Sequence, residues 1–202
     1  MRSGRRKRND HRPPLQIRMG QSKTGLILDT LSFNYLKKMY NESENKPPSF
    51  LVDGMLGSTA RKLRILGFDT AYNPNSTDSE LLEAASNAQR HLVTCDVDLY
   101  CLSRRRRIPA ILVSAKSEEQ QLCEVLSKCG IEHIEGLPRI SRCSICNGKL
   151  ALSSKDARGR EVYSCDVCGR QYWRGSHWKK LSAFFDNVDT LLRRAKSLGS
   201  GK

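Results

Sequence analysis

From Phe50 to Ile134, short apolar runs alternate with stretches of helical periodicity, and this alternation constrains the fold more than any other feature of the sequence. We expect strands over residues 50–53, 68–72, 91–95 and 109–114, with a further candidate over 131–134. Helical patterns fill the intervals, over residues 55–66, from 77 to about 88, over 99–104 as a short helix or turn, and from 117 to 129. Strands that alternate with helices predict an α/β fold, with a parallel sheet covered by helices on both faces and right-handed connections.

Local signals mark several helix ends within this pattern. Thr77 is followed three residues later by Glu80, and Ser117 is followed three residues later by Gln120. This is the spacing of a capping box at the start of a helix. Gly67 stands where the first helix of the unit needs a C′ residue.

Acidic residues stand at the ends of two predicted strands. Asp53 ends the first strand and Asp96 follows the third, while Asp78 opens the helix that leads into the third. An unpaired carboxylate is costly to bury, and sheets of this class bind ligands beyond the carboxyl ends of their strands. Carboxylates that converge there suit Mg²⁺ or Mn²⁺, which activate water and neutralise a phosphodiester. The alternative is structural, with Asp53 as a helix cap, Asp78 in a first turn and Asp96 in a turn.

Two CxxC pairs, eighteen residues apart, give residues 141–178 a different character. The spacing is that of a four-thiolate zinc site formed by Cys143, Cys146, Cys165 and Cys168. Four cysteines fill a tetrahedral shell, so we expect a zinc ribbon with a structural ion; two redox dithiols and an iron site are the alternatives. The other four cysteines are scattered through apolar or helical pattern, which is typical of free thiols in a reducing compartment.

Aromatic and basic residues are mixed directly after the second CxxC pair. Trp173, Arg174, His177 and Trp178 lie within a few residues of one another. Such side chains stack on unpaired RNA bases. The alternative is that the tryptophans pack the small module against the larger domain, because so small a module needs apolar cover.

The chain is strongly basic, with 35 Lys and Arg against 21 Asp and Glu in 202 residues and a formal net charge of +14. Residues 1–22 hold seven basic residues and one acid, and a run of four arginines follows later, at Arg104, Arg105, Arg106 and Arg107. A positive balance of this size favours nucleic acid as the partner. No apolar run is long enough to span a bilayer, and no apolar segment follows the basic amino terminus. We therefore expect a cytoplasmic protein without a membrane partner.

Composition divides the chain into five parts. We predict a disordered basic tail over 1–22, an extra helix and linker over 23–49, an α/β domain over 50–140, the zinc ribbon over 141–178, and a C-terminal helix and tail over 179–202. The last helical pattern, from His177 to about Ala195, carries a broad apolar stripe. This stripe is expected to pack the small module, or the helix itself, onto the α/β domain.

Several motifs, taken in order, resemble the Mut-seven C-terminal ribonuclease family, whose members are PIN-like domains with an appended zinc ribbon. The motifs are Phe50–Gly57, Ala60–Asp69, Leu92–Asp96, the two CxxC pairs and Tyr172–Trp178. The resemblance covers about residues 50–180. It implies a PIN-like nuclease domain over 50–140 with a metal-dependent ribonuclease activity.

The resemblance also implies roles for individual residues. The family's strand-end acids and helix arginines are matched by Asp53, Asp78, Asp96, Arg61 and Arg64. Cys95 stands where the family usually has a basic residue, and Asp98 stands where a basic residue is common. Asp98 either adds a metal ligand or only changes the surface.

We therefore predict an endoribonuclease in which Asp53, Asp78, Asp96 and Asp98 hold catalytic Mg²⁺ or Mn²⁺, beside a structural zinc. The helix arginines Arg61 and Arg64, the four-arginine run, Trp173 and His177 are the predicted RNA contacts. Ribosomal RNA, transfer RNA and the ribosome are candidate partners. The alternative, from a different functional class, is a non-catalytic RNA- or ribosome-binding protein on the same PIN-like scaffold.

Overall fold

The computed structural model describes residues 47–134 and 142–199. The basic tail predicted over residues 1–22 and the helix predicted between residues 23 and 49 lie outside these ranges, as does the predicted domain boundary near residue 140. The described residues hold the whole alternating pattern, both CxxC pairs and the last helix. Among them, no helix is both long and apolar enough to cross a membrane.

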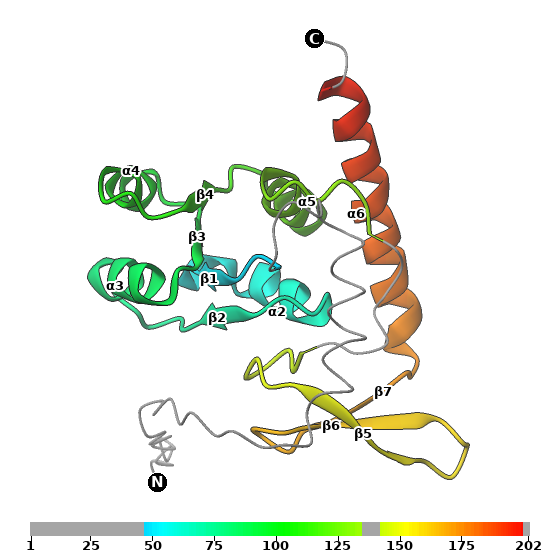
Figure 1. Ribbon diagram of the computed structural model, residues 1–202. Coiled ribbons are helices and arrows are strands. Elements are labelled where there is room, and N and C mark those ends of the chain that lie inside the picture. Colours follow the sequence, from blue (N-terminus) through cyan, green and yellow to red (C-terminus); the bar gives the residue numbers. More distant parts are fainter. Residues whose placement is uncertain (1–46, 135–141, 200–202) are drawn as a thin grey trace, which may run out of the picture.

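Four parallel strands form the centre of the α/β unit: β1 (Phe50–Val52), β2 (Thr70–Tyr72), β3 (His91–Thr94) and β4 (Ala110–Leu112). Their order is β2-β1-β3-β4, so β1 lies inside the sheet (Figure 1). In the register, Val52 pairs with Tyr72 on one side and with Val93 on the other. The carboxyl ends of β1, β2 and β3 are therefore level at one edge of the sheet.

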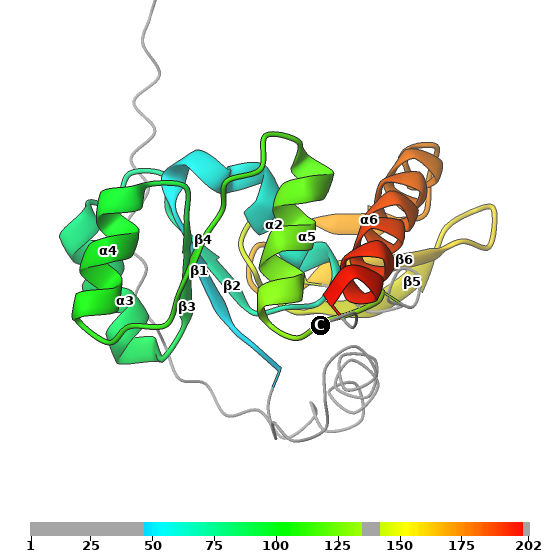
Figure 2. The same ribbon diagram turned by 90° about the horizontal axis from the view of Figure 1, so that it is seen from above.

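Helices cover both faces of this sheet, as the view from above shows (Figure 2). One face is covered by α3 (Asp78–Ala88) and α4 (Val97–Arg105), and the other by α2 (Gly57–Ile65) and α5 (Glu118–Lys128). A short 3₁₀ turn, η1 (Gly54–Leu56), joins β1 to α2. Each helix follows a strand and returns toward the opposite edge of the sheet, so α2, α3 and α4 all begin at the edge where the strands end.

The predicted helix ends are confirmed at three positions. Thr77 and Glu80 form a reciprocal capping box on α3, and the Ser117 hydroxyl accepts a hydrogen bond from the Gln120 amide at the start of α5. After α2, Gly67 has a φ of 95°. A residue with a side chain rarely adopts that conformation, which explains the glycine.

The cysteine module is an antiparallel sheet of three strands, β5 (Leu150–Lys155), β6 (Glu161–Cys165) and β7 (Gln171–Trp173), in the order β5-β6-β7. Most side chains of β5 are exposed, and the buried cluster of the module holds only Cys143, Leu150 and Cys165. So small a core needs a further cross-link, such as a metal ion. After β7, the closing helix α6 (His177–Gly199) runs back along the α/β unit (Figure 1).

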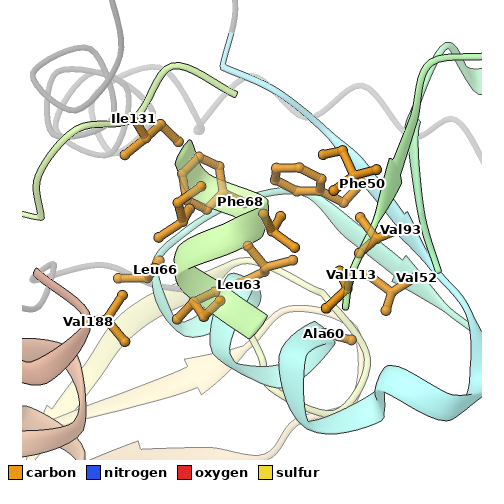
Figure 3. Close-up of a cluster of buried hydrophobic side chains, with 14 of the residues drawn as sticks. Phe50, Val52, Ala60, Leu63, Leu66, Phe68, Val93, Val113, Ile131 and Val188 are labelled. Carbon is orange, nitrogen blue, oxygen red and sulfur yellow. The ribbon is translucent and has the colours of Figure 1, made fainter. Parts of the chain in front are cut away.

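The two faces of the parallel sheet bury separate hydrophobic clusters. Successive residues of a strand point to opposite faces, so Phe50 and Val52 enter the larger cluster and Leu51 enters the smaller one. The larger cluster joins the sheet to α2, α5 and α6 (Figure 3). The smaller cluster joins it to α3 and α4. Burial on both faces explains why the first strand is apolar at every position.

Closing helix α6 completes the larger cluster with Phe185, Val188 and Leu192. Ile131 and Ile134 are buried in the same cluster, but the predicted strand over 131–134 is wrong, because these residues form no strand. The Ile134 amide instead donates to Asp189 Oδ1 on α6 (2.6 Å). The two isoleucines are buried because they pack in the cluster that α6 completes. The rest of the predicted fold class is confirmed: a parallel sheet flanked by helices, a cysteine-bearing antiparallel sheet and a closing helix.

Candidate functional site

A single buried hydroxyl holds two of the predicted acids at neighbouring strand ends. Asp53 follows β1, and its amide donates to Val93 O on β3 (2.9 Å). Thr94, which is 0% exposed at the end of β3, donates its hydroxyl to Asp53 Oδ2 (2.7 Å) and accepts from the Asp96 amide (2.9 Å). The structure thus brings Asp53 and Asp96 together at the carboxyl edge, with Thr94 between them.

Asp96 has a structural role as the cap of a helix, whereas the side chain of Asp53 caps no helix. Asp96 caps α4, because its Oδ1 accepts from the amides of Asp98 (2.7 Å) and Leu99 (3.0 Å). Asp53 stands in the equivalent place before η1 but makes no side-chain cap hydrogen bond. In the described part of the chain, one oxygen of each carboxylate therefore has no hydrogen-bond donor.

The other two predicted acids, Asp78 and Asp98, lie in the first turns of α3 and α4 and are exposed. The loop that leads to Asp78 lies against the turn after Asp53. A Cβ added at Gly54 would stand 2.9 Å from Pro74 O, and the Tyr72 hydroxyl donates to Gly54 O (3.0 Å). Glycine at this position therefore lets the loop approach Asp53.

Among the described residues, no cationic side chain neutralises the charge at this edge. Within residues 47–134 and 142–199, no lysine or arginine forms an ion pair with Asp53 or Asp96. The field of both acids reaches Cys95, whose thiol pKa is raised by burial and by the charges of Asp53 and Asp96. The edge is therefore an accumulation of negative charge that favours a bound cation.

The four acids do not form a closed cage. Among the described residues, the one group of three or more His, Cys, Asp or Glu side chains with ligand atoms within 4.8 Å of one another is the four-cysteine cluster. Mg²⁺ commonly takes only one or two carboxylates and completes its shell with water and substrate phosphates. Asp53 and Asp96 match that kind of open site.

The four cysteine sulfurs fit a tetrahedral ion. Cys143 Sγ lies 3.6 Å from Cys168 Sγ, and Cys146 Sγ lies 3.4 Å from Cys165 Sγ. A tetrahedral zinc with bonds of about 2.3 Å places sulfurs about 3.8 Å apart, whereas a disulfide needs about 2 Å. Both CxxC pairs thus contribute to one cluster, which supports structural zinc over two separate dithiols.

Each CxxC turn closes with a residue in the left-handed conformation. Asn147 (φ 68°) and Gly169 (φ 69°) each stand four residues after the first cysteine of a pair, and their amides donate to Cys143 O (2.9 Å) and Cys165 O (3.1 Å). Asparagine tolerates this conformation better than most residues, so it can replace glycine there. The first turn consequently carries an amide side chain that the second turn lacks.

Arg64, a predicted RNA contact, joins the α/β unit to the cysteine module. It is 4% exposed, and its Nε donates to Thr70 O (2.9 Å) while its Nη1 donates to Ser144 O (3.1 Å) and Ile145 O (2.9 Å). All three of these hydrogen bonds go to backbone carbonyls, two of them in the first CxxC turn. A buried guanidinium of this kind anchors the module to the sheet.

Asp69, just before β2, is the second anchor, and sequence reasoning gave it no role. Its Oδ1 accepts from Arg90 Nη1 (2.9 Å) and Asn147 Nδ2 (2.7 Å), and Asn147 Oδ1 accepts from the Thr70 amide (3.0 Å). Burial by itself raises the pKa of Asp69. The hydrogen bonds from Arg90 and Asn147 and the nearby Arg142 charge lower this pKa by more than burial raises it, so it lies below its ordinary value. The carboxylate is thus held ionised as part of the docking contact.

The remaining predicted RNA contacts are exposed and lie in three separate regions, one of which holds both Trp173 and His177. Arg61 projects from the middle of α2, Trp173 ends β7 and His177 begins α6. The four-arginine run 104–107 ends α4 at the edge of the sheet opposite Asp96. Basic residues at that end also complement the helix dipole. The structure therefore gathers two of the predicted acids but does not gather the predicted cations around them.

Comparison with known families gives one match. A family model described as the Mut7-C RNAse domain matches residues 48–185. The matched region begins just before β1 and ends within α6, so it spans the acid-bearing edge and all four cysteines. Searches among curated proteins and among solved structures found no match.

Proposed function

The chain belongs to the Mut7-C RNase domain family, and we propose that it is a metal-dependent endoribonuclease that hydrolyses RNA phosphodiesters at the carboxyl edge of its parallel sheet. The observation that carries this proposal is the Thr94 hydroxyl, which holds Asp53 and Asp96 side by side without a protein cation between them. The hydroxyl donates to the Asp53 carboxylate and accepts from the backbone amide of Asp96, so it fixes the two acidic residues relative to each other at this strand end.

Asp53 and Asp96 are the residues that would hold Mg²⁺ or Mn²⁺, through the carboxylate oxygens that have no donor among residues 47–134 and 142–199. Such an ion lowers the pKa of bound water and neutralises charge on the phosphodiester. Thr94 restrains the Asp53 carboxylate, and the Asp98 and Leu99 amides restrain Asp96. Exposed Asp78 and Asp98 extend the negative surface at the helix starts and are candidate ligands through water.

Exposed arginines supply the complementary charge for RNA phosphates. Arg61 lies on α2 about one turn beyond its first residue, near the acid-bearing edge. The four-arginine run, at the end of α4 and directly after it, is farther from the acids and suits phosphates farther along the RNA. Buried Arg64 is left out of this proposed contact surface, because its donors already bind carbonyl groups.

The test compares wild type with Asp53→Asn and with a matched control, Asp186→Asn, which removes an exposed acid from α6. Single-stranded and structured RNAs are incubated with Mn²⁺, with Mg²⁺ or with EDTA. We expect cleavage by wild type and by the control only when a divalent ion is present, and a loss of at least about a hundredfold in Asp53→Asn. Equal cleavage by wild type and Asp53→Asn would show that the acids do not carry the reaction.

A second candidate function is a non-catalytic RNA- or ribosome-binding protein. The observation that favours it is the capping role of Asp96, which by itself accounts for an acid at that position. This alternative predicts that no RNA is cut, while RNA binding and co-sedimentation with ribosomes persist unchanged in Asp53→Asn. Transfer RNA and ribosomal RNA are the probes that distinguish the candidate partners.

A further inference from the structure

A large groove lies where the cysteine module, the start of α6 and α2 meet. Its volume is about 840 Å³, which is within the range of ligand-binding clefts in proteins. Its walls come from α2, from β7 and the turn that follows it, and from the first two turns of α6. The groove thus exists because the module is docked on the α/β unit by Arg64 and Asp69.

Aromatic rings line this groove. Both tryptophans of the chain, Trp173 and Trp178, are among its walls, together with Tyr163, Tyr172 and Phe184. Trp173 is 53% exposed, which is unusual for so large an apolar side chain. The Arg174 guanidinium lies 4.5 Å from the centre of the Trp178 ring. These are the flat and cationic surfaces on which nucleobases stack.

The charged side chains that line the groove, among the described residues, are all basic. Lys62, Arg142, Arg174 and Lys180 line it, and none of the described residues that line it is an acid. Lys62 and Arg142 have acidic neighbours outside the groove, in Glu118 and Asp69. Arg174 and Lys180 form no ion pair with any residue in the described ranges. Two cations and several rings are therefore available to an anionic, aromatic ligand.

We propose that this groove binds unpaired nucleotides of single-stranded RNA, with bases against Trp173 and Trp178 and phosphates against Arg174 and Lys180. A duplex hides its base faces by stacking, so rings in a groove select unpaired strands. The segment 1–46 of the chain itself is a poor occupant, since it carries eleven basic and four acidic side chains and would be repelled. The proposal rests on the proposed function, because it names the class of RNA that reaches the acids.

The groove and the acids are placed so that one continuous RNA strand can contact both. α2 begins beside Asp53 at the carboxyl edge, and Lys62 and Ile65 near its other end line the groove. The helix covers about 12 Å between Gly57 and Ile65, at about 1.5 Å per residue. Arg61 lies one turn before Ile65 on the same side of α2, between the two sites. RNA that is bound in the groove can therefore pass Arg61 to reach Asp53.

The experiment uses the full chain in an Asp53→Asn background, so that cleavage does not interfere with binding. Because both tryptophans line the groove, their fluorescence reports occupancy directly. An oligouridylate and a duplex of equal length are titrated at fixed salt. Trp173→Ala and Lys180→Glu are the test variants, and Leu152→Ala and Lys155→Glu on exposed β5 are the matched controls.

We expect the single strand to quench the fluorescence and to bind more tightly than the duplex. Trp173→Ala should weaken binding roughly fivefold or more, as expected for the loss of one stacked base, and Lys180→Glu should weaken it in a salt-dependent way. Normal affinity in both test variants, or equal binding of duplex and single strand, would overturn the groove proposal. Cleavage assays are separate, so failure of the nuclease proposal leaves this binding result interpretable.

Discussion

Asp53 and Asp69 are both acids beside strands of the parallel sheet, but they lie at opposite edges and have different partners. Asp53 follows β1 and accepts a hydrogen bond from the neutral hydroxyl of Thr94. Asp69 precedes β2 and accepts hydrogen bonds from Arg90 and Asn147, with an ion pair to Arg142 as well (3.9 Å). One edge thus keeps its negative charge, and the other neutralises it.

This difference is what we expect if Asp69 stabilises the fold and Asp53 holds the proposed metal ion. At the Asp69 edge, Arg90 and the side-chain amide of Asn147 both donate to Oδ1, while the Arg142 charge faces Oδ2 at 3.9 Å, and these contacts tie the cysteine module to the sheet. At the Asp53 edge, an arginine would neutralise the charge and compete with a metal ion for the same oxygens. Burial and hydrogen bonding are present at both edges, so the presence or absence of a cationic partner is the informative feature.

The largest effect is expected from the cysteine cluster, on which the Asp69 edge depends. Cys165→Ser removes one thiolate, and structural zinc sites contribute on the order of 10 kcal/mol to folding of their modules. We expect about one zinc per wild-type chain by metal analysis, and a loss of that zinc in the variant. Amides of β5, β6 and β7 should lose hydrogen-exchange protection, while those of β1 and β3 keep it.

The matched control for this prediction is Cys101→Ser, which replaces an exposed cysteine of α4 that lies outside the cluster. It should retain zinc and the protection of the ribbon strands. Zinc retained at full occupancy by Cys165→Ser, or iron found in place of zinc, would contradict the assignment of a structural four-thiolate zinc site.

The next effect tests the structural role of Asp69. Asp69→Asn leaves the Arg90 guanidinium without its carboxylate and removes the charge that Arg142 faces. Hydrogen bonds to charged groups contribute about 1.5–3 kcal/mol each, and partial exposure reduces the value here. We expect the free energy of unfolding to fall by about 2 kcal/mol in urea titrations.

Activity gives the contrast between the two acids. Metal-dependent cleavage per folded molecule should be nearly normal in Asp69→Asn, because the carboxylate lies at the edge away from the proposed metal ligands. In Asp53→Asn the pattern should be reversed, with stability nearly normal and cleavage lost. If Asp53→Asn and Asp69→Asn change stability and cleavage in the same way, the proposed difference between the two edges is wrong.

The sequence was sufficient to predict a parallel sheet covered by helices on both faces, but not the docking of the module. Strand and helix order follow from periodicity, and the caps at Thr77 and Ser117 are local signals read within three residues. The contact between Asp69 and Asn147 joins residues 78 positions apart. It depends on how two separately folded units meet, which no local pattern encodes.

Arg64 is a second residue whose role depends on the docking of the module, because it was expected at the surface and is buried. Its match to a helix arginine of the family suggested a phosphate contact, and charged side chains are usually exposed. The first CxxC turn covers it, and its burial becomes evident only when the module is in place. The segment 131–134 is similar, because its two isoleucines are compatible with a strand or with cover by a helix.

The acid-bearing edge was more predictable, because parallel strands end together and Asp53 and Asp96 directly follow two of them. What the sequence left out was Thr94, although it lies inside the matched motif segment 92–96. Its importance depends on register: Val52 pairs with Val93, which places Thr94 beside Asp53. Register between strands 40 residues apart is set by the whole sheet, so the hydroxyl looked like one more strand residue.

The smallest of these effects, and the sharpest test of the edge, comes from Thr94 itself. Thr94→Val keeps the shape of the side chain but removes the donor to Asp53 and the acceptor for the Asp96 amide. We expect a loss of about fivefold in kcat with Mn²⁺ at saturating RNA, since one positioning hydrogen bond contributes about 1 kcal/mol. Thr94→Ser restores the hydroxyl and should restore kcat, which a purely structural role at this strand end would not require. If kcat falls equally in Thr94→Val and Thr94→Ser, the hydroxyl does not position the acids, and the two edges differ only in their cations.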